Sequence, residues 1–194
     1  REVARRIAHE IKNPLTPIKL SAERLKRKFG SQIEDPAFSE SVHIIFDQVD
    51  DLKALVNEFS NFARLPKSNP VEGSLNQIIE ETVSLFQSIH KDCRFHFHKD
   101  ENLPDFRFDP DQIKRVVTNL LDNAFAAVRK NENPLVEVTT HYESSLKIVR
   151  VSIKDHGEGV PKSLRDRIFE PYVTTKEQGT GLGLAIVKRT VEDH

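Results

Sequence analysis

Apolar side chains recur at alternating spacings of three and four over the first 63 residues of the chain. The first stripe consists of Ile7, Ile11, Leu15, Ile18, Ala22, Leu25 and Phe29, and the second of Val42, Ile45, Val49, Leu52, Val56, Phe59 and Ala63. Such spacing is typical of amphipathic helices, and GSQIEDPAF between the stripes has the composition of a loop. The pattern predicts an all-α helical hairpin over 1–65. Because two helices leave such stripes partly uncovered, we expect a homodimer in which two hairpins form a four-helix bundle.

A different pattern follows the segment RLPKSNPVEGS, where proline, glycine and serine interrupt the helical period. Residues 66–74 are therefore expected to be a linker. The sequence then predicts helices at 75–89, 110–130 and from about residue 182, separated by segments with the alternation of strands. The predicted strands are 94–98, near 106–108, 135–142 and 146–155. This order predicts an α+β domain over 75–194, in which a mixed sheet carries helices on one face.

Composition limits the partners and the compartment. The 29 basic and 30 acidic side chains give a net charge of -1, so nucleic acid or anionic lipid is not expected as the main partner. No apolar run approaches the roughly 20 residues of a membrane helix, and no membrane contact by this segment is expected. Cys93 is the single cysteine, which fits a reducing compartment, so the cytoplasm is the expected location. The chain begins without methionine and ends within an amphipathic pattern, and we expect it to be a piece of a longer protein.

The first helix carries a histidine on the side opposite its apolar stripe. His9 lies about 200° around the helix from the stripe, with Glu10 beside it and Asn13 one turn later. A neutral imidazole is a nucleophile, and a neighbouring carboxylate can accept its proton during attack. An isolated pair of this kind is more often ordinary surface, so it gains weight only beside a nucleotide site. Pro14 and Pro17 remove hydrogen bonds to the carbonyls of residues 10 and 13, which predicts that this helix can bend.

Polar residues follow one face of the helix predicted at 110–130, whose start is marked by Asp109 as the cap and Gln112 three residues later. Arg115, Asn119 and Asn123 follow one another at four-residue spacing. Amide oxygens are suitable Mg²⁺ ligands, and an arginine beside them suggests a phosphate contact. Asparagines exposed to water are the ordinary alternative. The buried stripe of the same helix is expected to be Ile113, Val116, Val117, Leu120, Leu121, Ala124 and Val128.

Two glycine-rich segments complete the candidate site. In KDHGEG, Asp155 ends a strand, Gly157 and Gly159 allow a sharp turn, and the carboxylate can accept from an exocyclic amine. The second segment has three glycines that lead into the last helix, Gly179, Gly181 and Gly183. The N–H groups at that helix start suit phosphates, and Lys176 is placed to help. Neither segment matches the Walker pattern or a strand-to-helix GxGxxG, so each segment alone is weak evidence for a nucleotide site.

Taken in order, HEIKN, NLLDN, DHGEG, FEPY and GTGLGL closely resemble the successive motifs of two-component sensor histidine kinases. The resemblance covers nearly the whole chain. The segments HEIKNPLTPIKLSAERLKRK and NEFSNFARLPKSNP look most like those of the NtrY-type nitrogen-regulation sensors. It implies a dimerisation and phosphotransfer hairpin followed by an ATP-binding sandwich of the gyrase, Hsp90, histidine kinase and MutL type. It also implies a full-length protein anchored in the inner membrane, and a catalytic domain whose C-terminal end is shortened here.

The resemblance implies roles for the hairpin. His9 would be the phosphoacceptor in ATP-dependent autophosphorylation, Glu10 the base that aids its attack, and Asn13 the residue that positions water when phosphate is removed from the partner. The phosphoryl group would pass to an aspartate of a response regulator receiver domain. Positions just beyond the site are candidates for docking that domain, namely Lys19, Ala22 and Glu23.

The resemblance also implies roles in the nucleotide site. Asn119 and Asn123 would hold Mg²⁺ and the triphosphate of ATP, and Asp155 would read adenine. Phe169 and Tyr172 would anchor a lid. The remaining positions implied for the pocket, the lid and the phosphates are Gly157, Gly159, Thr174, Thr175, Lys176, Gly179, Gly181 and Gly183.

One departure from the family pattern concerns the turn after Asn123. Many relatives carry a lysine or another polar residue there, whereas this chain has Ala126 and Ala127, and Arg115 or Arg129 could take over the phosphate contact. Two other functions stay open: an ATPase whose nucleotide gates a conformational clamp, and a phosphatase-biased scaffold that makes no phosphohistidine.

A zinc site is the other alternative that the sequence raises. The candidate ligands lie close together, at His90, Cys93, His96 and His98. Their spacing suits zinc poorly. His96 and His98 alternate with Phe95 and Phe97, which favours a strand with one solvent-exposed face and one buried face.

Overall fold

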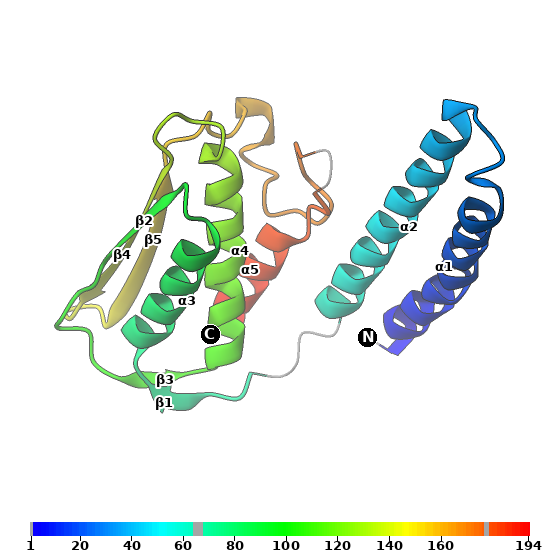
Figure 1. The fold of residues 1–194 in the computed structure, drawn as a ribbon. Coiled ribbons are helices and arrows are strands. Elements are labelled where there is room, and N and C mark those ends of the chain that lie inside the picture. The colour runs from blue at the N-terminus through cyan, green and yellow to red at the C-terminus, as the bar shows by residue number, and fades with distance from the viewer. Residues whose placement is uncertain (1, 64–67, 177–178) are drawn as a thin grey trace. The chain divides into compact units, whose positions relative to one another are not determined.

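A computed structural model describes residues 2–63, 68–176 and 179–194, and the side chains in these ranges except those of 2–7, 9, 58 and 61–63. The described chain divides into two compact units. One contains the helices α1 and α2 together with residues 174–182, and the other contains the strands and the helices α3, α4 and α5 (Figure 1). None of the helices in the described ranges is both long and apolar enough to cross a membrane.

The helices of the first unit form a hairpin of α1, Glu2–Phe29, and α2, Pro36–Ala63, as the apolar stripes predict. Side chains at most 6% exposed recur every seven residues, at Ala8, Leu15, Ala22, Val42, Val49 and Val56. Three residues further along the heptad, side chains stay 37–47% exposed, at Ile11, Ile18, Leu25, Ile45 and Leu52. We call this second set the apolar seam. One neighbouring helix covers only one side of a heptad stripe, so the seam is left uncovered in a single chain.

Helix α1 continues through Pro14 and Pro17. Each proline lacks the N–H that would bond the carbonyl four residues earlier, so the helix crosses this region with two fewer hydrogen bonds. The bend near these prolines stays a prediction.

The second unit contains a three-stranded sheet in the order β2-β4-β5, and the sheet is mixed, as predicted. Strand β2, Arg94–His98, is parallel to β4, Leu135–Glu143, which is antiparallel to β5, Ile148–Asp155. A separate antiparallel pair joins β1, Val71–Gly73, to β3, Phe106–Phe108. Strand β1 lies inside the stretch that the sequence predicts as a linker, because three residues are too few to show an alternating pattern.

Three helices lie on the same side of the three-stranded sheet (Figure 1). They are α3, Leu75–Ile89, α4, Pro110–Val128, and α5, Gly183–Asp193. The predicted cap of α4 is confirmed, since the Gln112 N–H donates to Asp109 Oδ1 at 3.0 Å. Side-chain capping satisfies a helix N–H that has no intrahelical partner, which explains why this helix begins where the sequence predicts.

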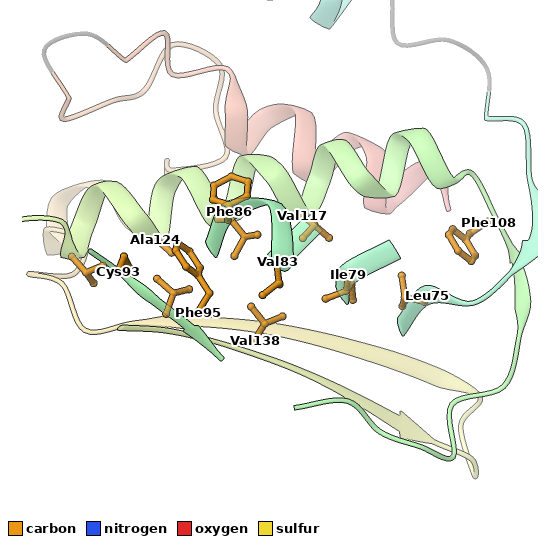
Figure 2. Packing of buried hydrophobic residues seen from close by; sticks show 13 residues of the cluster. Leu75, Ile79, Val83, Phe86, Cys93, Phe95, Phe108, Val117, Ala124 and Val138 are labelled. Carbon is orange, nitrogen blue, oxygen red and sulfur yellow. The ribbon is translucent and has the colours of Figure 1, made fainter. Parts of the chain in front are cut away.

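The hydrophobic core fills the space between the sheet and the helices α3 and α4 (Figure 2). Its buried members come from α3, α4, β2, β3, β4 and the residue before β2, and include Leu75, Ile79, Val83, Phe86, Phe95, Val117, Ala124 and Val138. Phe95 is buried, whereas His96 and His98 are exposed, so the predicted alternation of β2 is confirmed. Cys93 is buried, and burial raises the pKa of its thiol. The described residues contain no group of three or more His, Cys, Asp or Glu that could hold a metal.

Strand β2 lies at one edge of the sheet, and a side chain of α3 bonds to that edge. Gln87 Nε2 donates to the Cys93 carbonyl, and the Phe95 N–H donates to Gln87 Oε1, each at 3.0 Å. Arg94 faces the other way, because its N–H donates to the Pro134 carbonyl at 3.0 Å. The Gln87 amide therefore supplies one donor and one acceptor to backbone groups on the outer edge of β2.

Two aspartates fix loops of the second unit through backbone N–H groups. Asp100 accepts from the N–H groups of Tyr142 at 2.8 Å and Asn102 at 2.9 Å, and these bonds hold the pKa of its carboxyl below the usual value. Burial raises the pKa of the Asp109 carboxyl, but hydrogen bonds from backbone N–H groups lower it by more, so the net shift is downward. The first of these bonds comes from the Asn69 N–H at 2.8 Å. Both carboxylates are therefore more stable ionised in the folded protein than in an unfolded chain.

Candidate active site

One face of α4 carries the polar row that the sequence assigns to nucleotide. Arg115, Asn119 and Asn123 follow at four-residue spacing and are half-buried, and Ala127 continues the row. Residues four apart lie one above the other on a helix. From Asn119 to Ala127 the row extends about 12 Å at 1.5 Å per residue, a length that suits a nucleoside triphosphate laid along the helix.

The start of α5 lies against one end of this row. A Cβ on Gly183, the first residue of α5, would lie 3.8 Å from Asn119 Oδ1. The first N–H groups of a helix have no intrahelical acceptor and attract anions. Within the described part of the chain, the buried Nδ2 of Asn119 has no hydrogen-bond partner. Leaving a buried amide donor without an acceptor costs roughly 1–3 kcal/mol, so this end is suited to bind a ligand that brings acceptor oxygens, as phosphates do.

The loop after β5 lies against the other end of the row. The Gly157 N–H donates to Asp155 Oδ1 at 2.9 Å. A Cβ on Gly157 would lie 2.6 Å from the Cβ and 2.9 Å from the carbonyl oxygen of Ala127, so the loop backbone packs directly on α4. Gly159 has φ +76, with nothing within 4 Å of a Cβ built there, so its backbone conformation is what requires glycine. This end presents a carboxylate, which can accept from an amino group of a base.

A side chain that the sequence does not single out joins the same loop to α4. Asn131 Nδ2 donates to the His156 carbonyl at 3.1 Å. Asn131 belongs to NENP, a segment with ordinary turn composition, and its partner lies 25 residues further along. No local pattern marks such a pair, so only the folded structure brings it to light.

The lid positions Phe169 and Tyr172 follow the short 3₁₀ helix Lys162–Leu164. Their side chains are 43% and 55% exposed. Tyr172 has φ +68, a left-handed conformation that costs roughly 1–2 kcal/mol for a residue with a side chain. Strained backbone of this kind is frequent where a segment changes conformation. The anchoring role of these two residues stays a prediction.

The segment after Tyr172 forms a tight turn of its own. The Lys176 N–H donates to Thr174 Oγ1 at 3.0 Å, and a Cβ on Gly179 would lie 2.6 Å from that same oxygen. Thr175 is exposed, and Gly181 has φ +69. A side chain at residue 179 would therefore displace the Thr174 hydroxyl from this turn, and the backbone conformation favours glycine at residue 181.

The hairpin carries the predicted phosphoacceptor on α1. Glu10 and Asn13 are exposed there, while the side chain of His9 lies outside the described residues. Further along the hairpin, a groove of about 510 Å³ is lined by Lys19, Glu23, Lys26, Arg27, Phe46 and Asp50. Lys19 Nζ donates to both carboxylate oxygens of Asp50 at 2.7 Å, which joins α1 to α2 at the groove wall.

Two family models match the chain, one for each part. Residues 1–68 match the His Kinase A (phospho-acceptor) domain, and residues 108–194 match the histidine kinase-, DNA gyrase B- and HSP90-like ATPase. A solved catalytic domain of the histidine kinase ThkA is 35% identical, with a TM-score of 0.57; the match covers 64% of this chain and 81% of that one. The chain belongs to the two-component sensor histidine kinases. The predicted family and fold class are thereby confirmed.

Other relatives of this sensor histidine kinase cover more of its length. The nitrogen regulation protein NtrY of Azorhizobium caulinodans is 44% identical over the whole chain, which spans 26% of that protein. Full-length ShkA in complex with AMPPNP has a TM-score of 0.73 at 25% identity, over 99% of this chain and 41% of that one. ThkA in complex with the response regulator protein TrrA has a TM-score of 0.62 at 30% identity, over 90% of this chain and 51% of that one. The kinase is of the NtrY type, and its second unit is an ATP-binding domain.

Proposed function

We propose that this chain transfers the γ-phosphoryl group of ATP to His9 and then to an aspartate of a response regulator receiver domain. The observation that carries the proposal is the row on α4, because a buried amide donor and a helix start lie at one end and a carboxylate loop at the other. That arrangement is suited to a nucleotide with phosphates beside Asn119 and an adenine beside Asp155. The AMPPNP ligand of the ShkA relative supports the same choice.

The phosphoryl transfer requires little covalent chemistry from the protein. A ring nitrogen of His9 would attack the γ-phosphorus in line, the bond to the β–γ bridging oxygen would break, and ADP would leave. Glu10 would accept the proton of the other ring nitrogen as attack proceeds, so that the phosphorylated ring is left without a positive charge. Bound Mg²⁺, held by the amide oxygens of Asn119 and Asn123, would offset the negative charge of the phosphates. In the second step a receiver carboxylate oxygen attacks the same phosphorus, and the nitrogen–phosphorus bond breaks.

The pocket and lid residues are proposed to support nucleotide binding. Gly157 and Gly159 would shape the adenine pocket, and the N–H groups at Gly183 would bind phosphate oxygens. The lid would exclude water from the transferring group, with Phe169 and Tyr172 as its anchor. The lid positions proposed to close over the phosphates are Thr174, Thr175, Lys176, Gly179 and Gly181. Arg115 is the proposed additional phosphate contact.

The receiver domain is proposed to dock in the groove between α1 and α2. Lys19 and Glu23, two of the predicted docking positions, line this groove, and Ala22 is buried beside them. The groove contains both cations and carboxylates around Phe46, which suits a partner surface with an apolar centre and a polar rim. The ThkA relative was solved with a response regulator, which supports a partner of this kind.

A homodimer is proposed from the apolar seam. Its five side chains stay 37–47% exposed on a hairpin whose alternate heptad positions are buried, and a second hairpin would cover them as a four-helix bundle. The phosphatase activity proposed for the same domain rests on Asn13, whose exposed amide can orient a water. Activity of this core in the cytoplasm, and an inner-membrane anchor elsewhere in the protein, stay predictions.

Labelled ATP tests the proposal. Incubation with γ-³²P ATP and Mg²⁺ should give an acid-labile, base-stable label on the chain, as expected for phosphohistidine. His9→Gln should remove the label, whereas His43→Gln, which changes an exposed histidine of α2, should retain it. ATP hydrolysis without label would favour the conformational ATPase. Binding of a receiver domain with neither label nor hydrolysis would favour the phosphatase-biased scaffold.

A further inference from the structure

We propose that Asn131 is a positioning residue for base recognition, which orients the Asp155 carboxylate and thereby selects adenine over guanine. Asn131 lies just past the C-terminal end of α4, where its own N–H donates to the Val128 carbonyl at 2.8 Å. Its backbone is therefore fixed to the last turn of the helix. Its Nδ2 then donates to the His156 carbonyl at 3.1 Å.

The planar peptide between His156 and Gly157 transmits this contact to the carboxylate. The His156 carbonyl and the Gly157 N–H belong to one trans peptide, so they point to opposite sides of one rigid plane. Asn131 holds the carbonyl end of that plane, and the N–H end donates to Asp155 Oδ1 at 2.9 Å. Fixing one end of the plane fixes the direction from which the carboxylate is held. Successive hydrogen bonds also polarise one another, so the Asn131 donor strengthens the bond to Asp155.

Packing leaves the loop little freedom to find another position. The Gly157 backbone lies so close to α4 that a Cβ there would be 2.6 Å from the Cβ of Ala127. On the outer side, His156 Nε2 lies 3.9 Å from Glu137 Oε2 on β4. The loop is thus held by contact with α4 on one side and by a weak polar contact with β4 on the other. Asn131 contributes the hydrogen bond that sets its rotation.

The chemistry explains why such a fixed carboxylate discriminates between bases. Adenine presents an exocyclic amine that donates to a carboxylate oxygen, whereas guanine presents a carbonyl oxygen at the equivalent position. A carboxylate fixed in direction favours the donor and repels the acceptor, and a carboxylate that can rotate away discriminates less. The inference rests on the proposed ATP-binding function, but the tether itself is a property of the protein without nucleotide.

The test uses Asn131→Asp and Asn131→Ala in the 194-residue chain, with Asn133→Ala as a control in the same turn. Aspartate has nearly the shape of asparagine but offers no donor to a carbonyl. Without nucleotide, the Gly157 amide resonance should move upfield in both Asn131 variants, because its hydrogen bond to Asp155 weakens. In titrations, ATP affinity should fall about threefold to tenfold, the range expected for one net hydrogen bond. Inorganic tripolyphosphate, which has no base, should bind the variants and the wild type equally.

The outcomes separate this inference from the proposed function. An unchanged Gly157 resonance together with an unchanged preference for ATP over GTP in both variants would overturn the positioning role, although ATP binding would stand. Equal losses of ATP and tripolyphosphate affinity would also overturn it, because they indicate general damage to the site. A wild-type chain that binds neither ATP nor tripolyphosphate would overturn the nucleotide function itself, while the Gly157 resonance would still report whether the tether exists.

Discussion

Gly157→Ala is the substitution that most directly tests the adenine end of the site. The added methyl group would lie 2.6 Å from the Cβ and 2.9 Å from the carbonyl oxygen of Ala127, and 3.0 Å from Asp155 Oδ1. Non-bonded carbon atoms are stable at roughly 3.5–4.0 Å. The loop must therefore move about 1 Å away from α4 to accommodate the methyl group, and the Asp155 carboxylate must move with it.

Two effects follow from that displacement, one on stability and one on ATP binding. Overpacking against a fixed helix costs roughly 1–3 kcal/mol of unfolding free energy. Loss of the hydrogen bond between a charged carboxylate and the adenine amine costs about 1.5–3 kcal/mol of binding free energy, which corresponds to about 10-fold to 100-fold in the dissociation constant for ATP. Tripolyphosphate affinity should change little, because Asn119 and the start of α5 lie at the other end of the row.

The assay is a pair of titrations, with ATP and with tripolyphosphate, combined with thermal unfolding followed by circular dichroism. Gly73→Ala is the matched control, since a Cβ there meets only Phe108 at an ordinary 3.8 Å. ATP affinity within twofold of the wild type, with a melting temperature equal to that of the Gly73 variant, would refute the reasoning. Equal weakening of both ligands would refute the assignment of Gly157 to the base.

The remaining predictions concern stability, assembly and the helix of the phosphoacceptor. Asp109→Ala should lower the unfolding free energy of the second unit by about 2 kcal/mol in urea titrations, since it removes a helix cap and a second amide partner. The folded protein lowers the pKa values of Asp100 and Asp109. The two ionised carboxylates therefore stabilise the fold above the pKa of an unfolded aspartate, near about 4, and this stabilisation is lost as the pH falls through their lower pKa values in the folded state. Unfolding midpoints measured from pH 6 to 2 should fall accordingly. Ile18→Lys, which places a charge in the apolar seam, should shift sedimentation from dimer to monomer. Replacing both Pro14 and Pro17 with alanine should change the ratio of kinase to phosphatase activity, because it restores two helix hydrogen bonds.

Each of these predictions has a control or an opposing outcome. Asp111→Ala, an exposed acidic residue in the same helix turn, should leave urea stability nearly unchanged. An Asp100→Asn variant with the same acid profile as the wild type would contradict the assignment of that carboxylate. A dimer that survives Ile18→Lys would mean that the seam lies outside the interface. Equal activities in the double proline variant would remove the bend from the mechanism.

Periodicity alone predicted most of the helices and strands, because each long element has one face against a neighbour. The heptad stripes predicted α1 and α2, and the alternation in RFHFH predicted both ends of β2 correctly. The cap of α4 was predictable because Asp109 and Gln112 interact over three residues. Strand β1 was missed because its three residues pair with β3, about 35 residues away along the chain.

In the candidate site, too, the local motifs could be predicted from the sequence and the long-range contacts could not. Motif order indicates that Asn119, Asp155 and Gly183 serve one function, but not that α4 is the shared surface beneath them. Contacts such as Gly157 on Ala127 are invisible in sequence, because their partners lie 30 residues apart and neither is unusual by itself. Asn131 is the extreme case, since an asparagine in a turn usually bonds its own backbone, and here it bonds a loop from another element.

The Gln87 side chain has a consequence for how this protein behaves when crowded. A strand at the margin of a sheet offers unpaired donors and acceptors that a strand from another molecule can join, which is a route to aggregation. Gln87 already bonds the Cys93 carbonyl and the Phe95 N–H, so a foreign strand would first have to displace it. One glutamine thus protects β2 from intermolecular sheet extension, and a Gln87→Ala chain should form fibrillar deposits sooner at high concentration while keeping its fold.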